Sequence, residues 1–263
     1  MINLLSFRRI GAVFLRYYYT ITGLHQISEL FFWPLIDILL WGLTTVWLQQ
    51  QQNTPNLALI ILTALIFWQI ITRAAYDISV NLLQEFWNRN LVNLFSTPLT
   101  EMEWAIGSIL LSVCKILISL SFGALVIYLL YALNVFSIGF YFLPFAASLM
   151  LSGIALGFFS SCITIRWGQK LEMLAWMGPF FFAPFSAVFY PVASLPLWAQ
   201  AVSRCLPMTY IFEGMREVLQ TGQFSMTRFL TSICLNLCFL VVAVFLFKYA
   251  FHCSRIKGLA RLE

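Results

Sequence analysis

Four charged side chains within the first three long apolar runs of this sequence are the residues best suited to chemistry. Asp37 and Lys115 lie about two and about three helical turns inside their runs, so their depths differ by only about 5 Å. At such depths they can pair with each other or line a water-filled path. Arg73 and Asp77 are four residues apart, which lets them pair along one helix or extend toward water.

The sequence lacks the residues that ATP binding, hydrolysis and metal binding would need. The sequence has no G-x-x-x-x-G-K-[ST] motif, so it does not hold ATP through a P-loop. His25 and His252 lie outside the apolar runs, so no run offers a histidine to a Ser–His hydrolase or to a metal. Four of the six cysteines lie inside the runs, where cysteine behaves as a small hydrophobe. We expect no catalytic site, no metal site and no disulfide framework.

The composition places these residues in a membrane protein. Of 263 residues, 61% are hydrophobic and 10% are charged, whereas a soluble domain needs about a quarter charged residues. Six apolar runs are each long enough to cross a bilayer, which takes about 20 residues. They are Leu30–Leu48, Leu57–Ile78, Ala105–Tyr131, Tyr141–Ile165, Met173–Pro191 and Phe229–Phe251. The net charge of +5 then concerns topology, and we expect no nucleic-acid partner.

Basic residues between the runs predict the orientation. Residues 1–29, 79–104, 166–172 and 252–263 hold nine Lys and Arg, whereas the alternate connections hold three. Since the basic side of a membrane protein faces the cytoplasm, both termini are predicted to be cytoplasmic. The connection at 192–228 is then on the outer side.

Residues 1–29 predict a helix that lies in the cytoplasmic membrane interface, before a six-span domain at 30–263. Phe7, Phe14 and Tyr17 alternate with Arg8, Arg9 and Arg16, a mixture too polar to span but able to rest on lipid headgroups. An irregular tail is the alternative.

The cytoplasmic connection at 79–104 predicts an amphipathic helix of about residues 81–95. Its apolar residues recur at intervals of three and four, as on one face of a helix. Pro98 ends this helix, and Thr100 with Glu103 forms a capping box that starts the third span. The helix either rests in headgroups or faces a cytoplasmic partner, and periodicity leaves both open.

The outer segment at 192–217 is too broken for an ordinary loop. Pro196 and Pro207 delimit an apolar piece of about 12 residues, which is too short to cross a bilayer at 1.5 Å per residue. Two short re-entrant helices are predicted, with Glu213 and Arg216 paired on one face of the second. They serve either as a packed plug or as an outer gate.

The motifs of this segment resemble those of a known family. Tyr190-Pro191, Leu195-Pro196 with Trp198, Leu206-Pro207 with Thr209-Tyr210, and Glu213-Gly214 with Arg216 look like the pattern found in membrane subunits of ABC-2 type exporters. The connection that ends in Ser96-Thr97-Pro98-Leu99 with Glu101 is similar as well. The resemblance covers nearly the whole chain.

This resemblance implies an all-α membrane protein: six transmembrane helices, an N-terminal interfacial helix, a cytoplasmic coupling helix and short outer re-entrant helices. Two copies, or this chain and a similar permease, would form the pathway in a bacterial inner membrane. Two separate ATPase subunits would carry ATP and Mg, so this chain would not be an enzyme.

The resemblance also assigns roles to residues. Contacts to the ATPase would come from Leu83, Glu85, Phe86, Trp87, Arg89 and Asn90. The translocation path would involve Asp37, Trp41, Lys115, Trp176 and Phe180. An outer gate would contain Pro191, Pro196, Trp198, Pro207, Tyr210, Glu213 and Arg216.

The substrate is left open by the sequence. The run after Arg16 departs from the pattern of polysaccharide exporters, because Arg16-Tyr17 is followed by Tyr18-Tyr19-Thr20. A drug, a lipid or a lipid-linked glycan each fits an amphiphile exporter. Two other functions compete: a self-sufficient channel or carrier that uses Asp37 and Lys115, and a membrane scaffold without transport.

Overall fold

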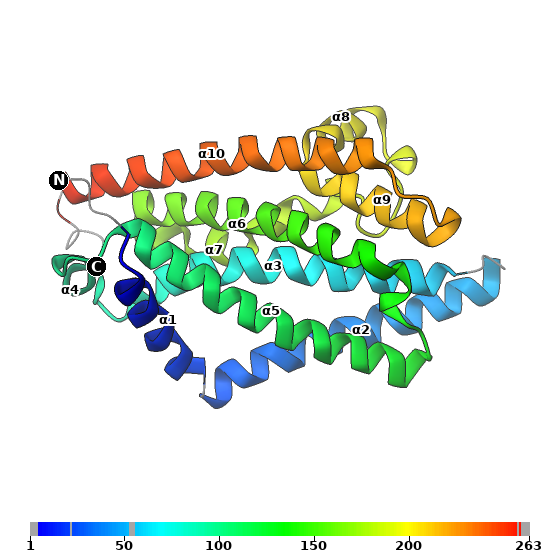
Figure 1. Ribbon diagram of the computed structural model, residues 1–263, viewed down its shortest axis with the longest axis horizontal. Coiled ribbons are helices and arrows are strands. Elements are labelled where there is room, and N and C mark those ends of the chain that lie inside the picture. The colour runs from blue at the N-terminus through cyan, green and yellow to red at the C-terminus, as the bar shows by residue number, and fades with distance from the viewer. Residues whose placement is uncertain (1–4, 22, 53–55, 257, 259–263) are drawn as a thin grey trace.

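The computed structural model describes residues 5–21, 23–52, 56–256 and 258, which form helices and connecting turns with no strand among them. Five of the helices belong to segments long and apolar enough to cross a membrane, and they run side by side along the molecule (Figure 1). These five are α2 (Leu24–Gln52), α3 (Leu57–Trp87), α5 (Glu101–Tyr131), α6 (Phe142–Trp167) and α10 (Met226–Ile256). The shorter α-helices are α1 (Phe7–Ile21), α4 (Leu91–Ser96), α7 (Glu172–Met177), α8 (Leu197–Cys205) and α9 (Pro207–Thr221).

The core is built around α3, which is buried along most of its length, whereas α10 exposes most of its surface. Small residues let α6 approach α3 closely. A Cβ at Gly153 would lie 2.6 Å from the carbonyl oxygen of Ile71, and one at Gly157 would lie 3.0 Å from that of Ala75. Both glycines are therefore required by this helix contact.

A polar seam joins α6 to α10. The Asn236 amide donates to the carbonyl and hydroxyl oxygens of Ser148 at 3.0 Å, and the Ser152 hydroxyl donates to the Asn236 side-chain oxygen at 2.7 Å. The hydroxyls of Ser148 and Ser232 are 2.9 Å apart. Such bonds between membrane helices average about 0.6 kcal/mol each, so the seam fixes register more than it stabilises the bundle.

The fifth predicted span, Met173–Pro191, is wrong as a continuous helix. Only α7 is α-helical there, and short 3-10 turns follow at Gly178–Phe181 and Ala183–Phe185. Pro179 and Pro184 lie in those turns, where each removes a backbone donor that an α-helix would use.

This irregular fifth segment nevertheless runs the length of the bundle. Before it, the Ile165 carbonyl accepts a hydrogen bond from Ser254 near the end of α10. After it, the Pro207 carbonyl accepts one from Ser232 near the start of α10. The 22 residues between Ser232 and Ser254 span about 33 Å at 1.5 Å per residue. The chain thus passes along the bundle six times, five times as a long helix and once as broken helix.

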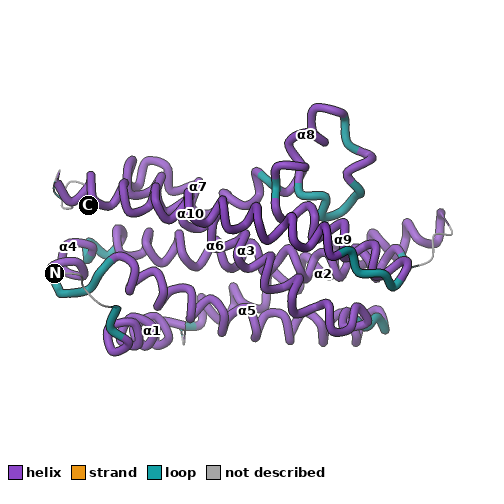
Figure 2. The backbone as a smooth tube through the Cα atoms, turned by 45° about the horizontal axis from the view of Figure 1, so that its top comes forward, coloured by secondary structure: helices purple, strands orange, loops and turns teal. Residues whose placement is uncertain are grey.

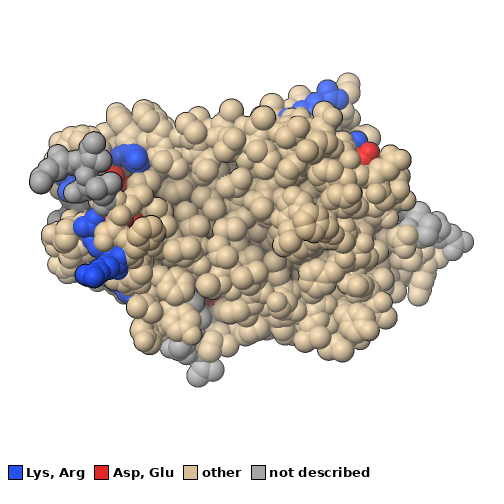
Figure 3. Space-filling view, in the orientation of Figure 1, with Lys and Arg blue, Asp and Glu red and all other residues tan. Residues whose placement is uncertain are grey.

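The two ends of the bundle differ. One end, called here the basic end, holds α1, α4 and the C-terminal end of α10, and the other, the hairpin end, holds α8 and α9 (Figure 1). Figure 2 shows that α8 and its flanking loops stand out from the side of the bundle. On the face in Figure 3, Lys and Arg gather at the basic end and near α8 and α9, with an uncharged band between.

Candidate functional site

The predicted single helix at residues 81–95 is two helices in the structure. Helix α3 continues from its apolar run to Trp87, a turn follows, and α4 starts at Leu91. Arg89 in the turn has a φ of 49°, a left-handed conformation that interrupts a helix. The Asn90 backbone N–H donates to the Glu85 carbonyl at 2.9 Å and closes the turn.

This break divides the six predicted coupling residues into two groups. Leu83, Glu85 and Phe86 are at most 1% exposed, so they belong to the interior and their prediction as a contact surface is wrong for this chain alone. Trp87 is 43% exposed, Arg89 is exposed as well, and Asn90 is half-buried. The reason is that α3 stays packed in the core beyond its apolar run, as far as Phe86.

Glu85 is the hub of the basic end. Its carboxylate accepts hydrogen bonds from Arg16 at 2.8 Å, from the Tyr17 hydroxyl at 2.7 Å and from the Asn90 amide at 2.7 Å. The Trp104 indole donates in turn to the Tyr17 hydroxyl at 2.8 Å. Burial, and then the Glu85 carboxylate, raise the pKa of Tyr17 well above its usual value, so its proton stays available to donate.

A second carboxylate, that of Glu103, fastens α1 to the start of α5. Arg9 donates to both of its oxygens at 2.7 to 3.0 Å, and the Ser6 backbone N–H donates at 2.7 Å. The capping box with Thr100 is confirmed, because each residue's side chain accepts from the other's backbone N–H. The N-terminal segment thus contains a helix, α1, bound to the bundle through two buried carboxylates, and its place at the membrane interface stays a prediction.

The buried ion pair of the bundle joins Lys115 to Asp77, at 2.9 Å between Nζ and Oδ1. The predicted pairs Asp37–Lys115 and Arg73–Asp77 are both wrong, because Lys115 points from α5 toward α3 and takes Asp77. Arg73 donates instead to the Glu29 carbonyl at 3.2 Å. Asp37 is partly buried on α2, and no ion pair or hydrogen bond of its side chain is found in the described part of the chain.

The predicted aromatic residues of the path do not gather around one cavity. Trp41 stacks on Phe189 of the fifth segment, with ring centroids 4.2 Å apart. Trp176 contacts the rings of Tyr76 and Trp87, whereas Phe180 meets Trp68 on α3. These contacts fasten the fifth segment to α2 and α3.

A polar cavity of about 70 Å³ lies beside the ion pair. It is lined by Glu29, Leu30, Arg73, Tyr76, Asp77, Val80, Asn81, Gln84, Trp87, Lys115 and Trp176. Sequence reasoning missed Glu29, Asn81 and Gln84, although a signal existed: the polar residues of α3 recur at intervals of four, four and three from Arg73 to Gln84. Among the described residues, no three His, Cys, Asp or Glu side chains gather to hold a metal.

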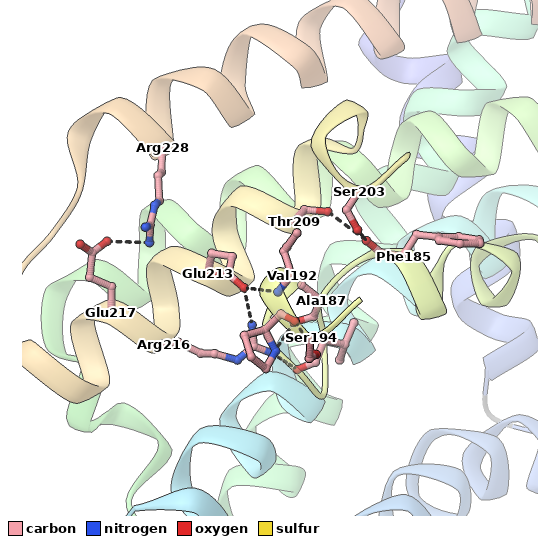
Figure 4. Close-up of polar contacts among 12 residues, drawn as sticks. Phe185, Ala187, Val192, Ser194, Ser203, Thr209, Glu213, Arg216, Glu217 and Arg228 are labelled. Atoms are coloured by element: carbon pink, nitrogen blue, oxygen red, sulfur yellow. Dashed lines mark hydrogen bonds and ion pairs between the residues drawn. The ribbon is translucent and has the colours of Figure 1, made fainter. Parts of the chain in front are cut away.

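At the hairpin end, Glu213 and Arg216 form the predicted pair, 3.3 Å apart (Figure 4). Glu213 also accepts from the Val192 backbone N–H at 3.0 Å. Arg216, only 8% exposed, donates to the carbonyls of Ala187 and Val188. Burial lowers the pKa of Arg216 and Glu213 opposes this, but an arginine of this kind stays charged.

The remaining residues of the predicted gate lie on α8, on α9 and in the turns before α8. The Ser203 hydroxyl of α8 and that of Thr209 of α9 both bond the Phe185 carbonyl (Figure 4). Helix α8 starts after Pro196, and α9 starts with a buried Pro207, as predicted. Pro191 and Trp198 are exposed, and the Tyr210 hydroxyl bonds the Arg204 carbonyl at 2.8 Å.

Comparison with known proteins agrees with this architecture. The sequence model of the family described as ABC-2 type transporter matches residues 16–220, which run from the Glu85 hub's Arg16 to the last turn of α9. A comparison with curated proteins finds no match. The matched part covers well over half of the chain. The protein is therefore a multi-pass membrane component of a transporter and belongs to the ABC-2 type transporter family.

Proposed function

We propose that this chain is the permease subunit of an ATP-driven exporter that moves an amphiphile out of the cytoplasm. Two copies, or this chain and a similar permease, form the pathway, and separate ATPase subunits bind at the basic end. Family membership supports the transport role, and the absence of a P-loop motif supports a separate source of ATP hydrolysis.

The observation that carries the proposal is the exposed turn Trp87–Asn90, called here the docking turn. Beneath it lie the Glu85 hub and the apolar contacts of α4, whose Phe95 meets Phe251 of α10 with ring centroids 4.6 Å apart. An exposed turn on a buried support can transmit a push from a partner into the bundle. We assign Trp87, Arg89 and the exposed face of α4 as the ATPase contact.

The exposed face of α2 supports a pathway between two copies. Trp33 and Leu40 are 60% and 57% exposed on this helix, and Asp37 lies on the same stripe. A carboxylate that faces lipid costs about 2.5–3.5 kcal/mol, so a cover of protein or a water-filled path is favoured over acyl chains. A second copy packed against α2 provides the protein cover or encloses the water-filled path, with Trp41 and Phe189 at the edge of the interface.

The hairpin end supports a gate at the outer side. Leu197 and Trp198 on α8 are 84% and 66% exposed, while the base of α8 is held by Ser203. A helix that is held on one face, at Ala199 and Ser203, and exposed on the other can move against the bundle without unfolding it.

The deciding experiment is purification of the tagged chain from its native membranes in mild detergent. We expect ATP hydrolysis to co-purify, and export of a fluorescent amphiphile from vesicles to require both that fraction and ATP. Transport by vesicles that contain this chain alone would overturn the proposal in favour of a self-sufficient carrier.

The docking turn has its own test. Trp87→Ala with Arg89→Glu is expected to remove most of the co-purifying ATP hydrolysis and to reduce export at least about tenfold, since it removes a contact anchor and reverses a charge. Arg204→Glu, the same reversal at an exposed site on α8, is the matched control and leaves the ATPase bound. Retention of ATPase by the docking-turn variant would contradict the assignment.

A further inference from the structure

The polar cavity contains groups that the fold itself does not satisfy. Asp77 is 1% exposed and Asn81 is 5% exposed, and both line the cavity from α3. Lys115 occupies only Oδ1 of Asp77, and Oδ2 is buried without a hydrogen-bond partner. The Nδ2 amide of Asn81 is likewise without one. A buried acceptor beside a buried donor indicates a place for a polar ligand, because unpaired groups of this kind cost about 1–3 kcal/mol each.

Arg73 adds a cation with unused hydrogen-bond capacity. It lines the same cavity and is partly buried, and its one hydrogen bond in the described structure goes to the backbone carbonyl of Glu29. A guanidinium has five N–H donors in a planar fork that matches phosphate and carboxylate groups. The remaining donors of Arg73 are therefore suited to an anionic group.

The net charge of the residues that line the cavity determines which net charge a ligand should carry. Glu29 and Asp77 supply two carboxylates, and Arg73 and Lys115 supply two cations, so the lining is neutral. A ligand with only one sign of charge would leave a net charge in a partly buried site, which is costly. A zwitterion brings both signs and keeps the site neutral.

The aromatic wall of the cavity suits an ammonium group. The rings of Trp87 and Trp176 lie 5.9 Å apart, and Tyr76 meets Trp176 edge to face at 5.4 Å. Ring faces attract ammonium groups, an effect that grows when water is excluded. Tyr76 directly precedes Asp77 on α3, whereas Trp87 lies about three turns from Asp77 toward the basic end.

We propose that this cavity binds the zwitterionic headgroup of a phospholipid-like amphiphile, with phosphate on Arg73 and ammonium at Asp77 Oδ2. Arg73 and Asp77 are about one helical turn, or 6 Å, apart along α3, which matches a short link between the two charges. An apolar pocket on α2 beside Glu29, lined by Ile27, Ser28, Phe31, Phe32 and Leu35, provides a path for the acyl chains. The export of this lipid rests on the proposed function, whereas its binding does not.

The test measures binding to the purified full-length chain by native mass spectrometry in detergent. Three probes share the same short chains: a phosphatidylethanolamine, a phosphatidic acid and an alkylammonium. We expect the wild type to bind the first at least about tenfold more tightly than either of the others. Equal binding of all three would overturn the proposal.

Two variants separate the two charges of the headgroup. Arg73→Gln should lower the affinity for the phosphatidylethanolamine to the affinity for the alkylammonium. Asp77→Asn with Lys115→Met, which keeps the bundle interior neutral, should lower the affinity for the phosphatidylethanolamine to the affinity for the phosphatidic acid. Gln69→Leu is the control, because Gln69 is a polar residue of α3 one turn from Arg73 and outside the cavity lining. Unchanged preference in both variants would contradict the assignment.

A last probe separates a lipid from a free headgroup. Phosphoethanolamine without acyl chains is expected to bind at least about a hundredfold more weakly, because it lacks the contacts along α2. Equally tight binding of the free compound would overturn the lipid assignment. These measurements involve neither ATP nor export, so their failure leaves the permease proposal standing. Loss of the co-purifying ATPase through Arg89→Glu alone, which leaves the cavity lining intact, would in turn leave lipid binding unaffected.

Discussion

The two ends of this molecule hold irregular backbone in place by opposite means. At the basic end, the buried carboxylate of Glu85 is satisfied by side chains from α1 and from the docking turn. At the hairpin end, the buried guanidinium of Arg216 is satisfied by the backbone carbonyls of Ala187 and Val188, with Glu213 beside it. The hub at Glu85 is thus bonded by side chains, whereas the hub at Arg216 is bonded mainly by backbone carbonyls.

This difference has consequences for motion. Side chains around Glu85 can exchange partners for water one at a time, since Arg16 is 41% exposed. The carbonyls around Arg216 have no such freedom, because a carbonyl that loses its donor must move its whole peptide unit. The basic end is thus a joint that can adjust to a partner, whereas the hairpin end is fixed at its base and free only at its tip.

The largest effect is expected from Arg216→Met. Removal of this partner takes the donor from two buried carbonyls and leaves Glu213 with only its bond from the Val192 N–H, and loss of one member of a buried charged pair costs about 3 kcal/mol or more. Thermal unfolding in detergent should show a large destabilisation. Hydrogen exchange should rise across residues 187–205 and stay unchanged in α1 and α4.

Arg216→Lys is the companion variant. A lysine keeps the charge but cannot reach two carbonyls with a planar fork, so an intermediate loss is expected. If Arg216→Met unfolds no more readily than the wild type, the carbonyl contacts do not hold the hairpin and the comparison of the two ends is wrong.

A smaller effect is expected from Glu85→Ala, at about 2–3 kcal/mol, because buried Tyr17 and Asn90 lose their acceptor while Arg16 turns to water. Hydrogen exchange should rise at residues 88–96 but not in α8 or α9. Glu172→Ala is the control, since the hydrogen bond that Glu172 accepts from the Trp87 indole at 3.2 Å is exposed. Faster exchange at the hairpin end as well would show that the two hubs are coupled rather than separate.

The sequence predicted the hairpin end better than the basic end. Pro196, Pro207 and the Glu213–Arg216 pair are local signals: prolines fix helix starts, and residues three apart on a helix face each other. The Glu85 hub is not local, because Tyr17 lies 68 residues from Glu85 and meets it only after α1 has packed on α5. No spacing rule reports such a pair.

The same distinction between local and non-local contacts explains the wrong predictions within the bundle. Asp37, Arg73, Asp77 and Lys115 were all identified as charged residues inside apolar runs, but depth alone does not say which face of a helix each occupies. Lys115 reaches Asp77 because α5 packs directly on α3. The prediction of a continuous fifth span failed for a local reason, since Pro179 and Pro184 in the sequence already argue against an unbroken helix.

The smallest effect is expected from Tyr17→Phe, and it sharpens the comparison most. The change keeps the ring, which is 3% exposed, and removes only the hydroxyl between Trp104 and Glu85. A loss of about 1–2 kcal/mol is expected, because the buried Trp104 indole loses its acceptor while Glu85 keeps its bonds from Arg16 and Asn90. Tyr18→Phe, at a 49% exposed neighbour, should leave thermal unfolding unchanged. A loss as large as that of Glu85→Ala would show that the hydroxyl is the hub of the basic end and that the carboxylate merely contacts it.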